Sequence, residues 1–341
     1  MGKKAQILLP IIFVFAILLS VIIAASIGVV SIPVEVLFDM VKSALGFPSQ
    51  PIPDYYEITL WQLRLPRIVM SLLTGASLAI CGSVFQTIFR NPICDPYILG
   101  ISSGASLGAA VAFILGWDAM LLGITIPALA TALITLFLIL GIARFNRNKN
   151  IETILLTGIA TNFLISAVIT LLLVVNQQEM NKIIFWTMGS FATVSWHEIK
   201  LLLPIFLICL SPLYYYAKDL NIMQLGIESA KSLGVDTRKT TFITLLFSSI
   251  LIATAVSFCG VIGFIGLIIP HIVRIIFGNH NRRLLTYSLF FGAFFMLLAD
   301  TLARTIAIPS ELPVGSITAM AGAPYFIYLL LRKGSFVHSN H

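Results

Sequence analysis

Residues 240–277 read TTFITLLFSSILIATAVSFCGVIGFIGLIIPHIVRIIF, with no Asp, Glu, Lys or Arg before Arg274. A membrane-spanning helix needs about 20 apolar residues. This stretch therefore holds either two spans or one span followed by a re-entrant piece. The choice decides whether the two ends of the chain lie on the same side of a membrane.

The basic residues favour two spans, because cytoplasmic loops carry an excess of Lys and Arg. The chain then has ten candidate spans, at 7–30, 66–88, 98–116, 119–143, 151–175, 199–217, 240–260, 261–277, 284–306 and 314–331. On the cytoplasmic side lie Lys3, Lys4, Arg90, Arg144, Arg147, Lys149, Lys218, Lys231, Arg238, Lys239, Arg274, Arg282, Arg283, Arg332 and Lys333. Outside lie Lys42, Arg64, Arg67, Lys182, Lys200 and Arg304. A single span would move four of the inside residues outward, so we expect about ten transmembrane helices with both termini in the cytoplasm.

Composition supports an all-α polytopic membrane protein. Of the 341 residues, 58% are hydrophobic and 10% are charged, whereas soluble domains carry about 25% charged residues. The apolar run 7–30 exceeds the roughly 7–15 residues of a signal peptide, and we expect it to be the first span. Residues 1–341 are predicted to form one transmembrane domain. Its larger loops are the external segments 31–65 and 176–198 and the cytoplasmic loop 218–239, and an amphipathic helix is expected near Val34–Leu45.

Several classes of function are disfavoured. No G-x-x-x-x-G-K-[ST] motif occurs, so ATP would have to bind a different polypeptide. No Ser/His/Asp constellation or H-E-x-x-H motif suggests catalytic residues, and the four cysteines form no CxxC pair or Cys/His cluster for a metal. The net charge of +7 comes from short clusters between apolar runs. We therefore expect no catalytic site, no metal site and no nucleic-acid partner.

The turn Arg90-Asn-Pro-Ile-Cys-Asp-Pro96 interrupts the helices at the expected cytoplasmic face, because two prolines four residues apart prevent a continuous helix. Asn91 and Asp95 can cap helices that follow them. The next segment, Gly100-Ile-Ser-Ser-Gly104, brings small and polar residues into a span. Such residues either permit close helix contact or line a polar path.

The cytoplasmic loop 218–239 is predicted to contain short helices separated by Gly226 and Gly234. An apolar seam is expected from Leu225, Ala230 and Leu233, with Glu228, Lys231 and Asp236 facing away. Such a helix either lies on the membrane surface or fits the groove of a soluble partner. Because the segment has few basic or aromatic membrane anchors, we favour a partner.

The stretch Gly260–Arg274 has closely spaced glycines and then a proline break at Pro270, beside His271 and Arg274. Ionisable groups at membrane depth are candidates for function. One His without a neighbouring Cys, Asp or Glu is a poor metal site. We expect His271 to bond backbone freed by Pro270, with a transported-ion role as the alternative.

Three arginines lie on the expected external face, against the positive-inside bias: Arg64, Arg67 and Arg304. Asp300 precedes Arg304 by one helical turn, where an i,i+4 pair can form. The arginines either reach lipid phosphate or form a docking surface for an acidic external partner. We favour docking, because arginine holds carboxylates bidentately.

A faint inverted repeat is also visible. Residues 76–82 read ASLAICG and are followed ten positions later by Pro92, while residues 254–260 read TAVSFCG and are followed ten positions later by Pro270. The expected topology runs these segments in opposite directions, as inverted repeats do in transporters. Chance is the alternative, because Gly and Ala are common in membrane helices.

The chain resembles the FecCD-type permeases, the membrane subunits of ATP-binding cassette (ABC) importers for iron–siderophore complexes, haem and cobalamin. The resemblance extends from about residue 61 to 332. It is carried in order by Leu63-Arg-Leu-Pro-Arg67, Gly75-Ala-Ser-Leu-Ala79, Arg90-Asn-Pro…Asp-Pro96, Leu225-Gly226…Ala230…Leu233-Gly234, Gly263-Phe-Ile-Gly-Leu267…Pro270-His271…Arg274, Ala299-Asp300…Ala303-Arg304 and Glu311-Leu-Pro-Val-Gly315…Gly322-Ala-Pro324. At one position the chain departs from the family, which often has Glu directly after the loop glycine; here Ile227 precedes Glu228.

The resemblance implies a cobalamin-importer-like permease fold in the bacterial cytoplasmic (inner) membrane. The expected partners are membrane lipid, two ATPase subunits that bind ATP and Mg²⁺, an external substrate-binding protein, and a second permease copy in a homodimer or a sister permease in a heterodimer. No cofactor is expected on this chain. The resemblance assigns ATPase coupling to Gln224, Leu225, Gly226, Glu228, Ala230, Leu233, Gly234 and Val235, a cytoplasmic gate to Asn91, Pro92 and Ile93, and docking to the three arginines. Pro270, His271 and Arg274 are expected to serve the pathway or its structure.

The expected mechanism is alternating access driven by the separate ATPase. The rival hypothesis is a proton- or ion-coupled secondary transporter, which needs buried acids or histidines along its spans. Within the spans only Glu152, His271 and Asp300 qualify. The cargo is expected to be a ferric siderophore, with haem, cobalamin or an oxyanion such as molybdate as alternatives.

Overall fold

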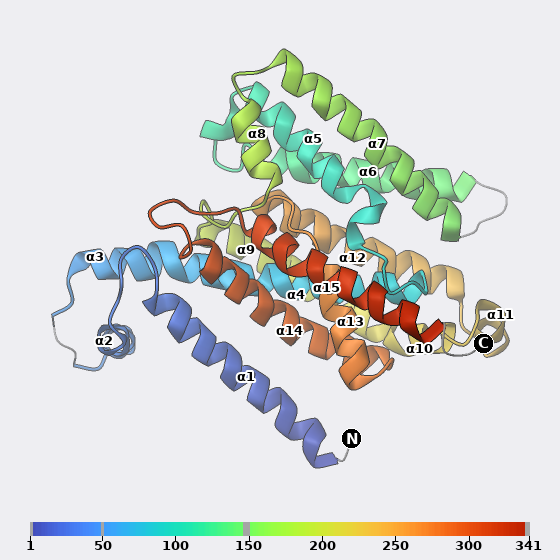
Figure 1. The fold of residues 1–341 in the computed structure, drawn as a ribbon, viewed down its shortest axis with the longest axis horizontal. Helices are drawn as coiled ribbons and strands as arrows, with labels where there is room; N and C mark the ends of the chain where they lie inside the picture. Colours follow the sequence, from blue (N-terminus) through green and yellow to red (C-terminus); the bar gives the residue numbers. More distant parts are fainter. Residues whose placement is uncertain (1–2, 49–50, 146–150, 338–341) are drawn as a thin grey trace.

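The computed structural model describes residues 3–48, 51–145 and 151–337, and within these ranges every regular element is a helix (Figure 1). The helices are α1 (Lys3–Ser26), α2 (Val34–Ala44), α3 (Asp54–Glu57), the π-helix η1 (Ile58–Arg64), α4 (Leu65–Ile88), η2 (Pro96–Leu99), α5 (Ile101–Ile114), η3 (Trp117–Ala119), α6 (Thr125–Phe145), α7 (Ile151–Val175), α8 (Met180–Thr187), α9 (Trp196–Tyr215), α10 (Ala217–Met223), α11 (Ile227–Ser232), α12 (Thr237–Cys259), α13 (Ile265–Phe277), α14 (Asn281–Ala303) and α15 (Val314–Val337). In a bilayer a helix bonds all its interior backbone groups within itself, which is why apolar runs take this form.

Six stretches of helix in the described residues are long and apolar enough to cross a membrane: Asp54–Ile88, Thr125–Ile142, Thr153–Val175, Trp196–Tyr215, Thr237–Cys259 and Asn281–Ala303. Three shorter apolar helices are Ile12–Ser26, Ile101–Ile114 and Ile265–Phe277. The expected all-α, multi-pass architecture is confirmed at this level. Two basic residues assigned to a cytoplasmic loop, Arg147 and Lys149, lie outside the described residues.

Helix α4 is the central element, with α14, α13, α12 and α9 packed around it. Small residues allow this close packing. A Cβ atom on Gly75 would lie 2.2 Å from the carbonyl oxygen of Gly292 in α14, and one on Gly82 would lie 1.8 Å from that of Gly266 in α13. Backbone-to-backbone contact of this kind is the usual way in which helices associate in lipid.

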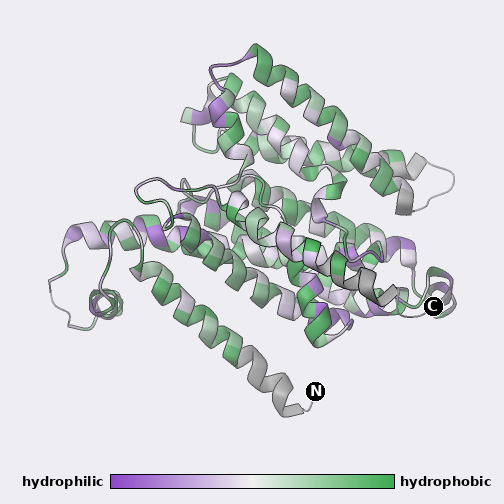
Figure 2. Ribbon diagram, viewed as in Figure 1, coloured by the Kyte–Doolittle hydropathy of each residue, from purple (hydrophilic) through white to green (hydrophobic). Residues whose placement is uncertain are grey.

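Helices α5, α6, α7 and α8 form a second group beside this central bundle (Figure 1). The most peripheral member is α7, which is hydrophobic along most of its length (Figure 2). Many of its apolar side chains are exposed in the single chain, among them Phe163 and Leu164. The start of α1 and the end of α15 point toward the end of the molecule that carries α10 and α11, while α2 and α3 lie at the opposite end (Figure 1).

The stretch 240–277 forms two helices, and the break between them lies at the predicted boundary after residue 260, while Pro270 does not interrupt the second helix. The break spans Gly260–Phe264, where both named residues have positive φ angles of 71° and 69°. Helix α13 continues through Pro270 because another side chain bonds the carbonyls near it. The side-chain amide nitrogen of Gln86, Nε2, lies 3.4 Å from the Gly266 carbonyl oxygen and 2.9 Å from that of Leu267. Since proline removes the i→i−4 bond to Gly266, the side-chain amide of Gln86 supplies a donor to this carbonyl oxygen.

The external segment 31–65 is only partly a loop. The expected amphipathic helix is confirmed as α2, but the helix expected to begin at 66 begins at Asp54 and runs without interruption to Ile88. The π-helical turns of η1 immediately precede Pro66. A π-type widening is a usual way for a helix to accommodate an irregularity. Arg64 consequently lies inside a continuous helix.

Candidate functional site

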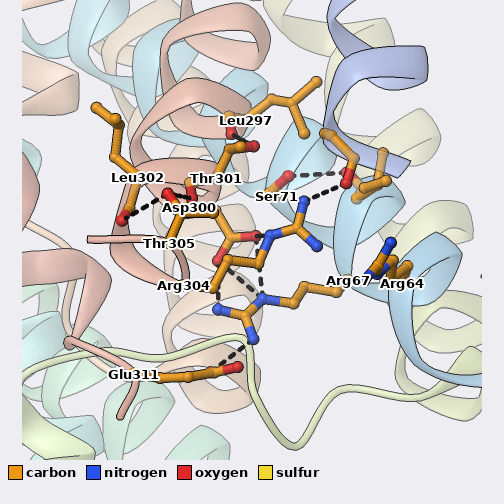
Figure 3. A network of polar contacts seen from close by, with 12 residues as sticks. Arg64, Arg67, Ser71, Leu297, Asp300, Thr301, Leu302, Arg304, Thr305 and Glu311 are labelled. Atoms are coloured by element: carbon orange, nitrogen blue, oxygen red, sulfur yellow. Dashed lines mark hydrogen bonds and ion pairs between the residues drawn. The ribbon is translucent and has the colours of Figure 1, made fainter. Parts of the chain in front are cut away.

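A buried ion cluster lies where α4, α14 and the segment after α14 meet (Figure 3). Asp300 is fully buried, and the Nε of Arg67 lies 2.9 and 3.0 Å from its two carboxylate oxygens. The Nη2 of Arg67 lies 2.8 Å from Asp300 Oδ1, and its Nη1 lies 2.7 Å from Glu311 Oε2. The guanidinium group of Arg67 is therefore shared between two carboxylates.

Arg304 belongs to the same cluster. The predicted i,i+4 pair with Asp300 is confirmed, with 3.9 Å between Arg304 Nε and Asp300 Oδ2. The closer contact of Arg304 is a hydrogen bond from Nη2 to the carbonyl oxygen of Ala24, near the end of α1. Asp300 is thus bonded mainly to Arg67, and Arg304 joins α14 to α1.

Arg64 also binds the end of α1. Its Nη1 donates to the carbonyl oxygens of Ala25 at 2.6 Å and Ser26 at 3.2 Å, and its Nη2 donates to that of Val30. The last carbonyls of a helix have no partner within it, and cations are favoured there by the helix dipole. Gly28 leaves room for the guanidinium group, because a Cβ atom on it would lie 2.6 Å from Arg64 Nη2.

These contacts bear on the docking hypothesis, which expects the three arginines on the external surface. Instead Arg64, Arg67 and Arg304 are only 6%, 8% and 5% exposed, and Glu311 is the more accessible member of the cluster. The sequence showed the Asp300 pairing but gave no signal for the α1 carbonyls or Glu311, which lie up to 280 positions away. Docking of a partner at these arginines stays a prediction, and the partner would have to compete with the contacts that the arginines make within the chain.

A cavity of about 450 Å³ lies next to this cluster, between α8, the start of α9, the end of α12 and residues 311–313. Its lining includes four aromatic side chains, and Lys182, Glu198 and Glu311 contribute charge. Each charged group already has a partner: Lys182 pairs with Asp118, Glu198 bonds Ser195 at the start of α9, and Glu311 pairs with Arg67. The cavity is therefore mixed in character, without an unpaired charge among these three groups.

At the other end of the molecule, the loop 218–239 folds as two short helices, α10 and α11. The predicted breaks are confirmed, with φ angles of 135° at Gly226 and 84° at Gly234. The predicted seam is wrong, because Ala230 is fully buried while Leu225 and Leu233 are 73% and 64% exposed. The reason is the Gly226 turn before α11 and the Gly234 turn after it, which place these leucines outside the helix face that Ala230 occupies.

The remaining residues of the predicted coupling set make local contacts. Gln224 Nε2 donates to the Asn279 carbonyl oxygen at 3.1 Å, and Glu228 pairs with Lys231 at 2.7 Å on the exposed side of α11. The N–H of Val235 donates to the Ala230 carbonyl oxygen at 3.0 Å, closing the end of α11 around Gly234. The exposed surface of the segment therefore includes two apolar side chains, Leu225 and Leu233, beside the Glu228–Lys231 pair.

Two side chains bond the backbone of the predicted gate turn. Asn91 Oδ1 accepts the Ile93 N–H at 2.9 Å, so Asn91 closes a turn that includes Pro92 and does not cap a helix. Asp95 does cap one, because its carboxylate accepts the Tyr97 N–H at 2.8 Å at the start of η2. Burial raises the pKa of Asp95 to about 6, opposed by this hydrogen bond. Ile93 is half exposed at the tip of the turn.

The segment Gly100–Gly104 supports close helix contact. Thr131 in α6 donates through Oγ1 to the Gly104 carbonyl oxygen at 2.6 Å, and the Ser103 hydroxyl bonds Asn162 Oδ1 in α7. A Cβ atom on Gly104 would lie 2.5 Å from Thr135 Oγ1. The small and polar residues here fasten α5 to α6 and α7.

Pro270 and His271 are buried within α13, and Arg274 lies near its C-terminus. Within the described ranges, Arg274 Nε and Nη2 have no hydrogen-bond partner. No group of three or more His, Cys, Asp or Glu residues in residues 3–48, 51–145 and 151–337 is arranged to hold a metal ion. The predicted roles of these three residues in a pathway are not tested by these contacts.

Comparison with known proteins places this arrangement in a family. The sequence matches the FecCD transport family over residues 14–332. It is 39% identical to the ABC transporter permease protein YvrB of Bacillus subtilis, over 92% of this chain and 90% of that protein. It is 42% identical to the cobalamin import system permease protein BtuC of Halobacterium salinarum, over 82% of this chain and 75% of that protein.

Other relatives are a hemin transport permease of Yersinia pestis, an Fe(3+) dicitrate permease of Escherichia coli and a molybdate import permease of Haemophilus influenzae, at 38%, 36% and 35% identity. They cover 80%, 82% and 83% of this chain and 82%, 86% and 85% of those proteins. A solved ABC transporter in an inward-facing conformation superposes with a TM-score of 0.82 at 32% identity, covering 94% of this chain and 97% of that one. The matched residues include all the motifs from Arg64 to Pro324. The members of the FecCD transport family named here are permeases of ABC importers, and this chain belongs to that family.

Proposed function

We propose that this chain is the membrane-spanning permease subunit of an ABC importer that moves an iron–siderophore complex, or haem or cobalamin, into the cytoplasm by alternating access. The observation that carries the proposal is the family match over residues 14–332. Relatives named for cobalamin, hemin and iron dicitrate all carry chelated metals or metal-containing cofactors. The permease itself breaks no bond, and ATP hydrolysis with its Mg²⁺ is assigned to two partner ATPase subunits.

The proposed topology has ten spans with cytoplasmic termini in the cytoplasmic membrane of a bacterium. Support comes from the start of α1 and the end of α15, which point toward the end of the bundle that holds α10 and α11 (Figure 1). Further support comes from the short helices α5 and α13, which are apolar and lie against α4 or its neighbours. The residues 1–341 act as one permease domain in this proposal.

We assign the ATPase contact to Gln224–Val235. The exposure of Leu225 and Leu233 beside a charged pair supports this assignment, since an exposed apolar side chain in a cytoplasmic loop suits a partner's groove. Movement of this segment would change the orientation of the helices next to the turn of Asn91, Pro92 and Ile93. We assign this turn to the cytoplasmic gate.

We assign the second permease copy to the side of the molecule that carries α7. Its exposed apolar face suits burial against a second copy or lipid. A homodimer places the substrate path between two copies. Pro270, His271 and Arg274 are then proposed to hold α13, which packs on α4, α14 and α15, in the bundle that supports this path. This assignment is tested by the oligomeric state of the purified complex.

An external substrate-binding protein completes the proposed importer. For its acidic side chains to reach Arg64, Arg67 and Arg304, they must compete with Glu311 and with the α1 carbonyls for the guanidinium groups. Docking at these residues therefore requires the end of α1 or the segment of Glu311 to move.

The cargo is tested by uptake of labelled ferric siderophore, haem and cobalamin in cells with and without this gene. Loss of one of these in the deletion strain, restored by the wild-type gene, identifies the cargo. A strain restored with an Arg64/Arg67/Arg304 triple alanine variant, checked for membrane content, tests docking. Unchanged uptake of all three cargoes in the deletion strain contradicts the cargo assignment.

The rival function, a proton-coupled secondary transporter, gains no support from the candidate acid. Asp300 is held in an ion pair with Arg67 and is therefore not a lone carboxyl group free to bind and release a proton. A buried paired carboxylate is a poor carrier for a proton that must be released at each cycle.

A further inference from the structure

Two hydrogen bonds to the side chain of Asn221 join helix α10 to the start of α14. Asn221 Oδ1 accepts the backbone N–H of Asn281 at 2.7 Å and its side-chain Nδ2 at 3.1 Å. Asn281 is the first residue of α14 and is 1% exposed. The start of α14, whose N–H groups lack partners within the helix, is thus bonded to α10.

The same buried amide continues into the centre of the bundle. The hydroxyl of Thr87 in α4 lies 3.0 Å from Asn281 Oδ1 and 2.8 Å from the Ser83 carbonyl oxygen of its own helix, and its hydrogen is shared between these two acceptors. One turn earlier in α4, the Ser83 hydroxyl donates to Ser288 Oγ in α14 at 2.8 Å. Thr87 is 4% exposed, and Ser83 and Ser288 are fully buried. We call Asn221, Asn281, Thr87, Ser83 and Ser288 the polar latch.

Apolar contacts also hold α10, through Ala217, Leu220 and Met223. Such contacts are non-directional, so they allow one helix to slide against another. Hydrogen bonds require a defined distance and angle, and a buried donor or acceptor that loses its partner is costly. The polar latch therefore fixes the register of α10 against α4 and α14, which the apolar contacts alone do not.

A second link reinforces it at the end of α4. The Nη2 of Arg90 donates to the carbonyl oxygen of Met223, the last residue of α10. Arg90 has a positive φ of 49° directly after α4 and directly before the gate turn. The end of α10 and the start of the gate turn are thus bonded to each other.

We propose that the polar latch is the positioning device that carries movement of the coupling segment into α4 and α14, and that its residues set how much transport each ATP drives. The inference rests on the proposed function, because it assumes that an ATPase bound at Gln224–Val235 moves α11 and with it α10, which α11 contacts. It adds that Thr87 and Asn281, outside the coupling segment, are required for that movement to reach the gate.

The test uses Thr87→Val, which keeps the size of the side chain and removes its hydroxyl, beside Thr87→Ser, which keeps the hydroxyl. The permease is reconstituted in proteoliposomes with its ATPase subunits and binding protein, and import of labelled cobalamin, haem and ferric siderophore is measured per ATP hydrolysed. Asn176→Ala, which removes a single side-chain bond at the opposite end of the molecule, is the matched control. Asn221→Ala, at a partly exposed position, tests the same latch if Thr87→Val folds poorly.

The expected result is continued ATP hydrolysis with import per ATP lowered at least about fivefold, the low end of coupling between sites, in Thr87→Val and Asn221→Ala. Thr87→Ser and Asn176→Ala are expected to match the wild type. If import per ATP hydrolysed is unchanged in Thr87→Val and Asn221→Ala, the inference is overturned. The same holds if hydrolysis and import fall by the same factor, because their ratio is then unchanged.

Hydrogen exchange of the α10 amides gives a readout that does not depend on transport. Exchange is expected to be at least about fivefold faster in Thr87→Val than in the wild type and near wild-type in Thr87→Ser. Unchanged exchange overturns the latch. If the wild-type complex fails to import with ATP, the proposed function fails, and the exchange rates still decide whether the latch holds α10.

Discussion

Arg67 in α4 and Asp300 in α14 form a buried ion pair across 233 positions of sequence, with 2.8 Å between Nη2 and Oδ1. A charge in a low-dielectric interior is tolerated only when it is paired and hydrogen-bonded. Here Glu311 adds a second carboxylate at 2.7 Å and Arg304 a second guanidinium group at 3.9 Å. The pair therefore fixes the ends of α4 and α14 that lie near α1.

Breaking this pair is expected to be costly. Arg67→Ala and Asp300→Ala should each lower the free energy of unfolding by roughly 3–5 kcal/mol, because each leaves the other charge buried without its partner. The double variant should lose less than the sum of the two. Thermal unfolding of the purified permease in detergent measures this, with the exposed Arg282→Ala as the control. Additive losses would show that the two residues do not stabilise each other.

Removing Arg64 is expected to loosen the end of α1. Arg64→Ala leaves the carbonyl groups of Ala25 and Ser26 without this donor, at a cost of about 1–3 kcal/mol. Hydrogen exchange near the end of α1 should accelerate, while the middle of α1, where Phe13 packs on Phe291 with ring centres 4.6 Å apart, should change less. The exposed Arg238→Ala is the control. An equal acceleration of hydrogen exchange at the end and in the middle of α1 would contradict the capping role of Arg64.

Close packing of α4 and α13 predicts a sharp difference between two glycines. Gly82→Ala would place a Cβ atom 1.8 Å from the Gly266 carbonyl oxygen, so the helices must separate and the yield of folded protein should collapse. At Gly141 in α6 no atom lies within 4 Å of the added Cβ atom. Gly141→Ala should therefore be neutral or stabilising by roughly 0.5–1 kcal/mol, because Ala favours a helix. Similar effects at both positions would contradict the packing.

The sequence was a good guide to features that depend on neighbouring residues. Gly226 and Gly234 end short helices, Asp95 caps the next one, and Asp300 lies one turn before Arg304; all these follow from local spacing and are confirmed. Local pattern failed where the partner is distant. Pro270 looked like a break, but Gln86 bonds the carbonyls beside it from 180 positions away, and the helix continues.

The arginines show the same limit. Counting charges placed Arg64, Arg67 and Arg304 outside and therefore suggested exposure. Nothing in their local sequence indicates that the end of α1 provides unpaired carbonyl groups, or that Glu311 folds back onto Arg67. Their burial is a property of tertiary packing. The proposed docking and coupling roles concern partner proteins, which the sequence suggests only through resemblance.

The gate turn is expected to respond to pH through Asp95. Burial raises the pKa of this carboxyl group from 3.8 to about 6, so the folded state binds the proton more tightly than the unfolded state. The stabilising contribution is complete below pH 3.8 and is lost as the pH rises through about 6. Asp95→Asn keeps an oxygen that accepts the Tyr97 N–H and removes the charge. It should be more stable than the wild type at pH 7–8, by roughly 1–3 kcal/mol, and similar near pH 4.

Thermal midpoints of the wild type and Asp95→Asn between pH 4 and 8 measure this difference. Glu228→Gln, at an exposed position of α11, is the control and should not alter the profile in the same range. A constant difference between the wild type and Asp95→Asn across this range would show that Asp95 does not titrate there.

The most direct test of the central claim is uptake into proteoliposomes that contain the permease, its ATPase subunits and its binding protein, with labelled ferric siderophore, haem and cobalamin offered outside. As an ABC-importer permease, the chain should support accumulation of one of these when ATP is supplied to the ATPase side, and a protonophore should leave that accumulation intact. Accumulation that needs no ATP and collapses with the proton gradient would contradict the account and identify a secondary transporter.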